Sequence, residues 1–359
     1  MPMAPYRAKA TTALAVFSLL VCAWLLFLSP RRYTLSDDGG SVIDVDVGAG
    51  AGIIPAPATT RPASATPTTP STSSTSGTLV PRAAELVVAS RMQEDTRWIH
   101  QYLPEWPRNI YIVDNASAAL TVPKNKGHEA MVYLTYLIDR YDTLPDVSVF
   151  IHASRFAWHN DNPDYDNVAF LRRLKVPYIR SQGYVNLRCV WVLGCPSEIR
   201  PHVDALSADE LAVSTAPVNA KYIYKQAFED LMPGEEVPAV VGVSCCSQFA
   251  VSRDAVRHRP KKDYVHMRDW LLKTPLADDL SGRVLEYSWH IIFGKESVFC
   301  PNAGECYCKV YGLCDLSCNS QDKCDNRYHF PTVATLPHGW PRIGWDGERR
   351  EYEADLSFG

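Results

Sequence analysis

An uncharged and mostly apolar run from Thr11 to Leu28 sets the first residues apart from the remainder of the chain. In a helix that rises about 1.5 Å per residue, this run reaches about 27 Å, enough to span a thin bilayer. It is followed by Ser29-Pro30 and then by Arg31-Arg32 rather than by a small-x-small cleavage site, which favours a retained anchor over a cleaved signal peptide. We therefore predict a signal-anchor transmembrane helix over residues 11–29 and a cytoplasmic tail over residues 1–10.

Residues 30–84 are predicted to form a disordered stalk rich in Ser, Thr and Pro. From Ala49 to Pro81 the sequence has almost no charge and few large apolar side chains, so it cannot offset the entropy cost of its own ordering. The composition is typical of the O-glycosylated stems of Golgi enzymes, and it suits a flexible linker equally well.

Cysteine usage indicates an oxidising compartment. Apart from Cys22 there are ten cysteines between Cys189 and Cys324, an even number suited to disulfides. The last six follow the pattern C-x5-C-x-C-x5-C-x3-C-x5-C, which contains no C-x2-C knuckle and therefore favours disulfides over structural zinc. Adjacent Cys245 and Cys246 are expected to pair elsewhere rather than with each other. The C-terminal domain is thus predicted to lie in the lumen of the ER or Golgi.

Composition limits what the rest of the chain can be. With 46% hydrophobic residues the sequence can bury a sizeable core, and a net charge of −4 provides no basic field for nucleic acid. We expect one α/β domain over residues 85–299, followed by a Cys-rich, disulfide-bonded appendage and tail over residues 300–359.

Short β-branched runs alternate with amphipathic stretches after Arg82, which is typical of βαβ units. Strands are predicted over residues 85–90, 109–115 and 147–153, with helices over 94–103 and 128–144. This pattern predicts a mostly parallel sheet with helices on both faces.

Polar residues follow each predicted strand, at Ser90-Arg91-Met92, Asp114-Asn115 and His152-Ala153-Ser154. Ligand sites of parallel sheets lie outside the carboxyl ends of the strands, so we place the site there. The sequence contains no G-x-G-x-x-G, no G-x4-G-K-[ST] and no G-x-S-x-G, and so lacks the main signals of dinucleotide folds, P-loop NTPases and serine hydrolases.

Three stretches, VVASRMQEDTRWI, YIVDNAS and NKGHEAMVYLTYLIDRYDTLPDVSVFIHAS, resemble in layout the opening of a GT-A glycosyltransferase that uses a nucleotide-sugar. The resemblance implies a Rossmann-like α/β fold and a donor site. Where such enzymes carry Asp-x-Asp, this chain has His152-Ala153-Ser154, so the usual Mg²⁺ or Mn²⁺ clamp lacks its ligands. A divalent metal is possible but the cofactor stays unknown.

The motifs NKGHEAMVYL, LPDVSVFIHA, AWHND, GYVNLRC, CCSQFAVSR, SGRVLEYSWHIIFG and CYC also resemble a largely fungal family defined as a domain of unknown function. This resemblance extends over nearly all of residues 85–315. It implies no established reaction.

Several polar residues are candidates for substrate binding. Asn125 and Lys126, at the expected start of a helix, are suited to a diphosphate, although they equally suit a simple turn. FIHASRFAWHND brings two imidazoles, an indole and a carboxylate into one loop, where they bind substrate or metal or only hydrogen-bond locally. The residues concerned are Asp114, Asn125, Lys126, His152, Trp158 and His159, with Asp161 as the possible metal ligand.

Residues later in the chain are candidates for acceptor binding and catalysis. Gln248 and Arg253 lie where a strand is expected to lead into a helix, a segment that often binds the acceptor in the GT-A enzymes it resembles. Glu286 and His290 are four residues apart, so a single helix would place them on one face. The segment resembles the helix that follows the acceptor loop in GT-A enzymes, which implies that Glu286 is the general base. A surface Glu–His pair is the alternative.

These observations predict a lumenal, membrane-anchored glycosyltransferase-like protein that moves a sugar from a nucleotide-sugar to a glycan or protein acceptor. Two alternatives stay open: a non-catalytic carbohydrate-binding or scaffold protein, and a His/Asp metal-dependent hydrolase.

Overall fold

A computed structural model of the chain describes residues 84–213, 218–331, 333 and 335–352. The predicted tail, anchor helix and stalk therefore lie outside the described residues, except for Ala84. In the part of the chain that is described, no helix has both the length and the apolar character needed to cross a membrane.

The central sheet has five strands in the order β2-β1-β3-β6-β4. Strand β1 pairs in parallel with both β2 and β3, whereas β6 pairs antiparallel with β3 and with β4. The sheet is thus mixed, with a parallel core of three strands. The strands are β1 (Ala84–Ser90), β2 (Arg108–Ile112), β3 (Val147–His152), β4 (Tyr184–Asn186) and β6 (Phe249–Ser252), and a small second sheet contains β5 (Gly242–Val243) and β7 (Val298–Phe299).

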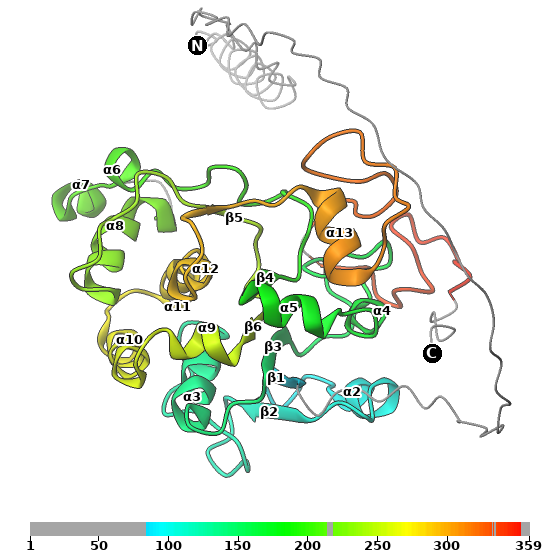
Figure 1. Cartoon of the computed structure of the whole chain (residues 1–359), viewed down its shortest axis with the longest axis horizontal. Coiled ribbons are helices and arrows are strands. Elements are labelled where there is room, and N and C mark those ends of the chain that lie inside the picture. Colours follow the sequence, from blue (N-terminus) through cyan, green and yellow to red (C-terminus); the bar gives the residue numbers. More distant parts are fainter. Residues whose placement is uncertain (1–83, 214–217, 332, 334, 353–359) are drawn as a thin grey trace, which may run out of the picture. The chain divides into compact units, whose positions relative to one another are not determined.

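Side chains alternate between the two faces of this sheet, as strand geometry requires. Leu86 and Val88 of β1 belong to one hydrophobic cluster, and Val87 between them belongs to the other. Because both faces are apolar, helices cover both, which confirms the predicted α/β layering (Figure 1).

The helices divide into two sets. The first set packs on the Val87 face: α3 (Ala130–Arg140), α8 (Ala220–Leu231), α10 (Lys261–Lys273), α11 (Asp278–Glu286) and α12 (Trp289–Ile292). The second packs on the Leu86 face: α2 (Arg97–Tyr102), α4 (Asn167–Leu171), α5 (Val176–Gln182) and α13 (Ala303–Tyr311). Three short helices complete the described chain: α6 (Pro201–Asp204), α7 (Ala208–Val213) and α9 (Arg253–Arg257).

The Cys-rich region is more closely integrated than an appendage at the domain edge. Helix α13 buries Tyr307, Val310 and Tyr311 in the hydrophobic cluster of the Leu86 face. Two disulfides, Cys189–Cys306 and Cys195–Cys300, join this region to segments more than a hundred residues earlier. Cys308–Cys314 and Cys318–Cys324 close short loops.

Cys245 and Cys246 are bonded to each other, so the prediction that each pairs elsewhere is wrong. The two residues lie in the turn between β5 and β6, where Cys246 has a φ of 151° and Ser247 a φ of 56°. This bend brings the neighbouring sulfurs together, and the other eight described cysteines are already paired among themselves.

Candidate functional site

A cleft of about 700 Å³ opens at the carboxyl ends of β1, β2 and β3. Ser90 and Arg91 line it from the end of β1, Val113 from the end of β2, and His152 and Ser154 from the end of β3. Parallel strands end at one edge of a sheet, which is why these residues meet. Asp114 itself lies beside the cleft, where its carboxylate accepts a hydrogen bond from the backbone N–H of Met92 at 2.9 Å.

The turn before α3 forms a second wall of the cleft through Asn125, His128 and Glu129. The backbone of this turn is left-handed at Gly127 (φ 67°) and His128 (φ 52°). Helix α11 packs closely against it, because a Cβ added to Gly282 would lie 2.9 Å from His128 Cδ2 and 3.0 Å from the Gly127 carbonyl oxygen. The position of Glu129 in the cleft therefore depends on α11.

Lys126 does not line the cleft. Its ammonium donates a hydrogen bond to the Leu276 carbonyl oxygen at 2.7 Å and lies 3.9 Å from a carboxylate oxygen of Asp278. The side chain is almost buried and holds the start of α11 against the turn before α3. Of the two candidates for a diphosphate site in this turn, only Asn125 lines the cleft.

His152 is held between two acceptors. Its Nδ1 lies 2.9 Å from a carboxylate oxygen of Glu129, and its Nε2 lies 2.7 Å from the Cys246 carbonyl oxygen. Both nitrogens donate only when the ring is an imidazolium. Burial opposes this charge, but the Glu129 carboxylate and the Cys246 carbonyl outweigh it and raise the pKa of His152. For Glu129, burial is likewise outweighed by His152, which holds the pKa of Glu129 at about 2.

His159 and Trp158 extend the aromatic lining next to His152. The rings of His152 and His159 are stacked with centroids 4.7 Å apart, and Trp158 lies 4.2 Å from His159 on the other side. Burial and the neighbouring His152 lower the pKa of His159 to about 3, so its ring is neutral at physiological pH. One wall is completed by Thr335 and Leu336 from the C-terminal segment.

Asp161 and Gln248 support the cleft from behind. The buried Asp161 carboxylate accepts hydrogen bonds from the backbone N–H groups of Cys189 (2.6 Å) and Val190 (3.1 Å) and from the Tyr307 hydroxyl (2.5 Å). These three bonds occupy most of the acceptor positions of the carboxylate, and Asp161 does not line the cleft. Gln248 accepts a hydrogen bond from the backbone N–H of His152 at 3.2 Å, and so ties the start of β6 to the end of β3.

Arg253 lies at the opposite edge of the sheet. Strand β6 runs antiparallel to β3, so Arg253 at its end is next to the start of β3. There it forms an ion pair with Asp146 at 2.7 Å and donates a hydrogen bond to the Leu144 carbonyl oxygen. The structure therefore separates Arg253 from Gln248 and from the cleft.

Glu286 and His290 do not share a helical face, so this part of the prediction is wrong. Helix α11 ends at Glu286 and α12 begins at Trp289. The Ser288 hydroxyl donates a hydrogen bond to the Val284 carbonyl oxygen at 2.7 Å. A side-chain bond of this kind competes with the backbone hydrogen bonds of a helix and is compatible with the break between α11 and α12. His290 is buried, and its Nε2 donates to the Ser297 carbonyl oxygen at 3.0 Å.

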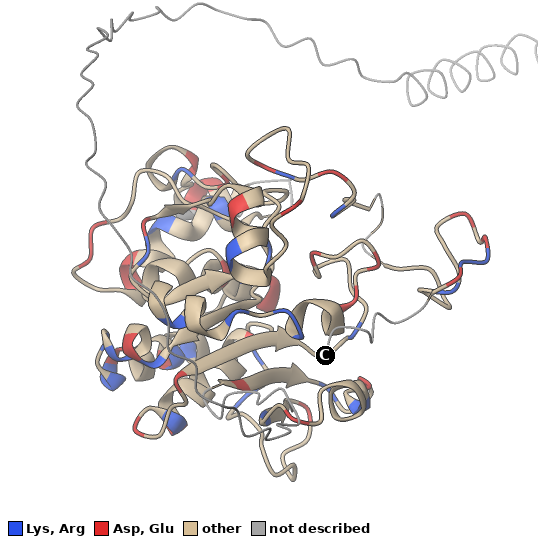
Figure 2. Cartoon of the chain, turned by 45° about the vertical axis from the view of Figure 1, so that its right-hand side comes forward, with Lys and Arg blue, Asp and Glu red and all other residues tan. Residues whose placement is uncertain are grey.

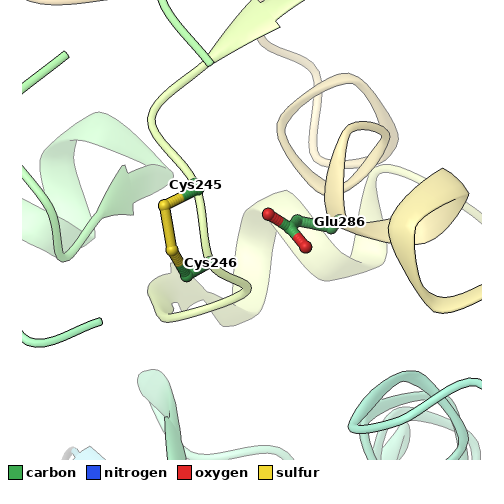
Figure 3. Close-up of side chains that lie close together, drawn as sticks. All are labelled: Cys245, Cys246 and Glu286. Atoms are coloured by element: carbon green, nitrogen blue, oxygen red, sulfur yellow. A yellow bond between two sulfur atoms is a disulfide. The ribbon is translucent and has the colours of Figure 1, made fainter. Parts of the chain in front are cut away.

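Glu286 is instead directed toward the disulfide between Cys245 and Cys246 (Figure 3). Its side chain is 14% exposed and lies 3.4 Å from Arg283. Burial raises the pKa of Glu286 to about 7, although Arg283 opposes the shift. Glu286 is not among the residues that line the cleft. Cys246, beside Glu286, is joined to the cleft because its carbonyl oxygen accepts a hydrogen bond from His152.

Arg188 is part of this region and was missed by sequence reasoning. It is only 2% exposed, and its Nη1 lies 3.3 Å from the Cys245 sulfur and 3.5 Å from the Cys246 sulfur. Its guanidinium also lies 4.3 Å from the centre of the Tyr328 ring. The motif GYVNLRC contains this arginine, but nothing in the motif indicates that the charge is buried.

Possible metal ligands converge at one place in the described residues. The two sulfurs of Cys245 and Cys246 and a carboxylate oxygen of Glu286 all lie within 4.8 Å of one another. In the disulfide, the sulfurs are not available as thiolates.

The fold and the cleft together define an α/β protein with an open cleft at the carboxyl ends of the parallel strands of its sheet. The chain belongs to the family described as Protein of unknown function (DUF3431), whose model matches residues 86–309. No curated protein and no solved structure matches the chain. The family match ends before Thr335 and Leu336, which form one wall of the cleft.

Proposed function

We propose that this protein is a membrane-anchored, lumenal glycosyltransferase that moves a sugar from a nucleotide-sugar to a glycan or protein acceptor. The observation that carries the proposal is the cleft of about 700 Å³ at the carboxyl ends of β1, β2 and β3. Small-molecule sites commonly have about 300–1,000 Å³, so the cleft has room for a nucleotide-sugar. The layout of the first three strands, which resembles a GT-A enzyme, supports the same class of donor.

The cleft combines the groups that such a donor needs. Arg91 supplies positive charge for a diphosphate, whereas the charge of the His152 imidazolium is already balanced by Glu129 at 2.9 Å. Trp158 offers an apolar ring for a base or sugar, and the carboxylates of Glu94 and Asp278 are acceptors for sugar hydroxyls. Basic and acidic residues are interspersed over the ribbon in Figure 2, without a large region of one sign. Recognition of the donor is therefore assigned to the groups in the cleft rather than to a charged surface.

The two carboxylates near His152 differ in basicity. Glu129 is held as an anion by its ion pair, with a pKa of about 2, which makes it a poor base. Glu286 has a pKa of about 7, close to the value that suits a general base at neutral pH. We therefore assign the activation of the acceptor hydroxyl to Glu286, with the acceptor approaching from its side of Cys246.

The proposed compartment follows from the disulfides. Five disulfides in the described residues suit an oxidising, secretory-type compartment. An anchor over residues 11–29 would hold the enzyme on the lumenal side of an ER or Golgi membrane, where glycan and protein acceptors are available.

Thermal-shift screening and calorimetry with nucleotide-sugars test the proposal. Arg91→Gln removes a cation that lines the cleft, and Arg97→Gln is the matched control, because Arg97 is exposed and pairs with Asp95 outside the cleft. We expect at least one nucleotide-sugar to stabilise the wild type and the control, and to bind Arg91→Gln about tenfold more weakly. The proposal fails if no nucleotide-sugar binds. Binding of a free glycan without any sugar transfer would instead favour the carbohydrate-binding alternative.

A further inference from the structure

The disulfide between Cys245 and Cys246 does not hold distant parts of the chain together. It joins adjacent residues, whereas Cys189–Cys306 joins residues 117 positions apart. A disulfide stabilises a fold mainly by restricting the unfolded chain between its cysteines, and here no residue lies between them. The role of this pair must therefore come from its immediate surroundings.

Those surroundings provide a third ligand atom. Glu286, the last residue of α11, directs its carboxylate at the two sulfurs, and the three ligand atoms lie within 4.8 Å of one another (Figure 3). Zinc binds thiolates and carboxylates at about 2.0–2.3 Å, so ligands of one ion lie within roughly 4 Å of each other. Once the sulfur–sulfur bond is open, small side-chain movements suffice to reach this spacing.

Arg188 balances the charge of such a site. Its Nη1 is 3.3 Å and 3.5 Å from the two sulfurs, and a cation at this distance favours the thiolate form of a cysteine. Two thiolates and the Glu286 carboxylate carry three negative charges, and Zn²⁺ with Arg188 carries three positive charges. Zn²⁺ and Arg188 thus balance the charge of the three ligands, as a buried position requires, and the half-exposed Arg283 lies 3.4 Å from Glu286.

We propose that the Cys245–Cys246 disulfide is reducible and that its dithiol form, together with Glu286, binds one thiophilic divalent ion such as Zn²⁺. A small dithiol supplies the two electrons and two protons that open the bond, and is itself oxidised to a disulfide. The two thiols then release their protons when the ion binds. The site adjoins the cleft, because the Cys246 carbonyl oxygen accepts a hydrogen bond from His152 at 2.7 Å.

This inference is independent of sugar transfer, because its readout is bound metal. The full chain is treated with dithiothreitol under conditions that keep its circular dichroism unchanged, then mixed with Zn²⁺, desalted and analysed for metal. Cys245→Ala/Cys246→Ala removes the site, and Cys318→Ala/Cys324→Ala is the matched control, because it removes another disulfide of the same chain. Co²⁺ in place of Zn²⁺ reports thiolate ligation through its absorption spectrum.

We expect the reduced wild type to bind one zinc ion more than reduced Cys245→Ala/Cys246→Ala, and the control to keep that ion. Glu286→Gln should weaken zinc binding at least about tenfold. Equal zinc content in the wild type and the double variant would overturn the proposal. So would alkylation mapping in which Cys318–Cys324 opens while Cys245–Cys246 stays closed. If the double variant does not fold, Cys246→Ser, which leaves one sulfur at the site, serves for the same comparison.

Discussion

The imidazole of His152 and the carboxylate of Glu129 lie 2.9 Å apart at the edge of the cleft, and each holds the other in its charged form. The pair joins the end of β3 to the start of α3, the helix that precedes β3 in the chain and packs on it through Tyr133 and Tyr136. The charged states of His152 and Glu129 therefore depend on this contact.

Glu129→Gln tests this contact. Without the carboxylate, burial dominates, so we expect the pKa of His152 to fall below its ordinary value of 6.5 and the ring to become neutral at pH 7. Loss of this charged hydrogen bond should cost about 2 kcal/mol of unfolding free energy. Imidazole NMR titration and denaturant unfolding measure the two effects. Glu94→Gln is the control, since Glu94 lines the same cleft without contacting His152.

The free energy of unfolding should change with pH in two ranges, one set by His152 and one by Glu129. The His152 pKa is raised in the fold, so its contribution is fully present below about pH 6.5 and is lost as pH rises through the folded value. The Glu129 pKa is lowered from 4.5 to about 2, so its contribution is present above pH 4.5 and is lost as pH falls toward 2. Glu129→Gln should remove the acidic limb and reverse the limb near neutral pH, because a His152 pKa below 6.5 makes stability rise with pH up to about 6.5. Limbs that persist unchanged in this variant would be assigned to other groups.

Glu286→Gln separates catalysis from stability. If Glu286 is the base, turnover should fall by roughly 10² to 10⁴ while donor affinity changes little, and wild-type turnover should rise with pH through about 7. The raised pKa means that ionised Glu286 destabilises the fold above pH 4.5. The variant should therefore be more stable than the wild type at pH 8, by about 3 kcal/mol, and equally stable near pH 4.5. Unchanged turnover in a folded variant would remove Glu286 from the mechanism.

Nucleotide-sugar binding should not require Mg²⁺ or Mn²⁺. His152-Ala153-Ser154 stands where Asp-x-Asp would supply ligands, and Asp161 accepts three hydrogen bonds from other donors and does not line the cleft. Calorimetry with and without EDTA should give the same affinity. Complete loss in EDTA, restored by Mn²⁺, would show that Glu94, Glu129 or Asp278 forms a clamp in the cleft.

Gly282→Ala tests how α11 positions the turn before α3. Alanine favours a helix by about 1 kcal/mol over glycine, but here its Cβ would lie 2.9 Å from His128 Cδ2 and 3.0 Å from the Gly127 carbonyl oxygen. We expect a net loss of about 1–2 kcal/mol and a shift of the His152 resonances, because Glu129 follows the turn. Asp279→Ala, an exposed change in the same helix, is the control and should leave both unchanged.

Protease protection in intact microsomes tests the lumenal placement of residues 85–359. A C-terminal epitope should resist protease until detergent is added. Digestion of that epitope without detergent, with an N-terminal epitope protected, would reverse the topology and remove the setting of the proposed transferase.

The parts of the fold with strong local patterns were predictable from sequence. Strands β1 and β3 follow from short runs rich in β-branched residues. The helices between them follow from amphipathic patterns, such as the one in which Trp98 and Ile99 are buried. The cleft lies at the carboxyl ends of these strands, where the sequence predicts a ligand site.

Long-range contacts account for what sequence reasoning missed. The direction of Lys126 depends on α11, about 150 residues later, and the burial of Arg188 depends on Cys245, Cys246 and Tyr328. Likewise, β6 runs antiparallel to β3, which separates Arg253 from Gln248 although both lie in one short motif. None of these relationships leaves a periodic signal in the sequence.

Because Thr335 and Leu336 lie beyond the last residue matched by the family model, the mouth of the cleft is built partly from a segment that the family pattern does not constrain. The Trp340 indole joins this segment to the part of the fold that the family model matches, because it donates a hydrogen bond to the Asp164 carbonyl oxygen at 2.7 Å. Ligand preference can therefore diverge between relatives without altering the sheet. A chimera that exchanges residues 325–352 between two members should carry the ligand preference of the donor of that segment.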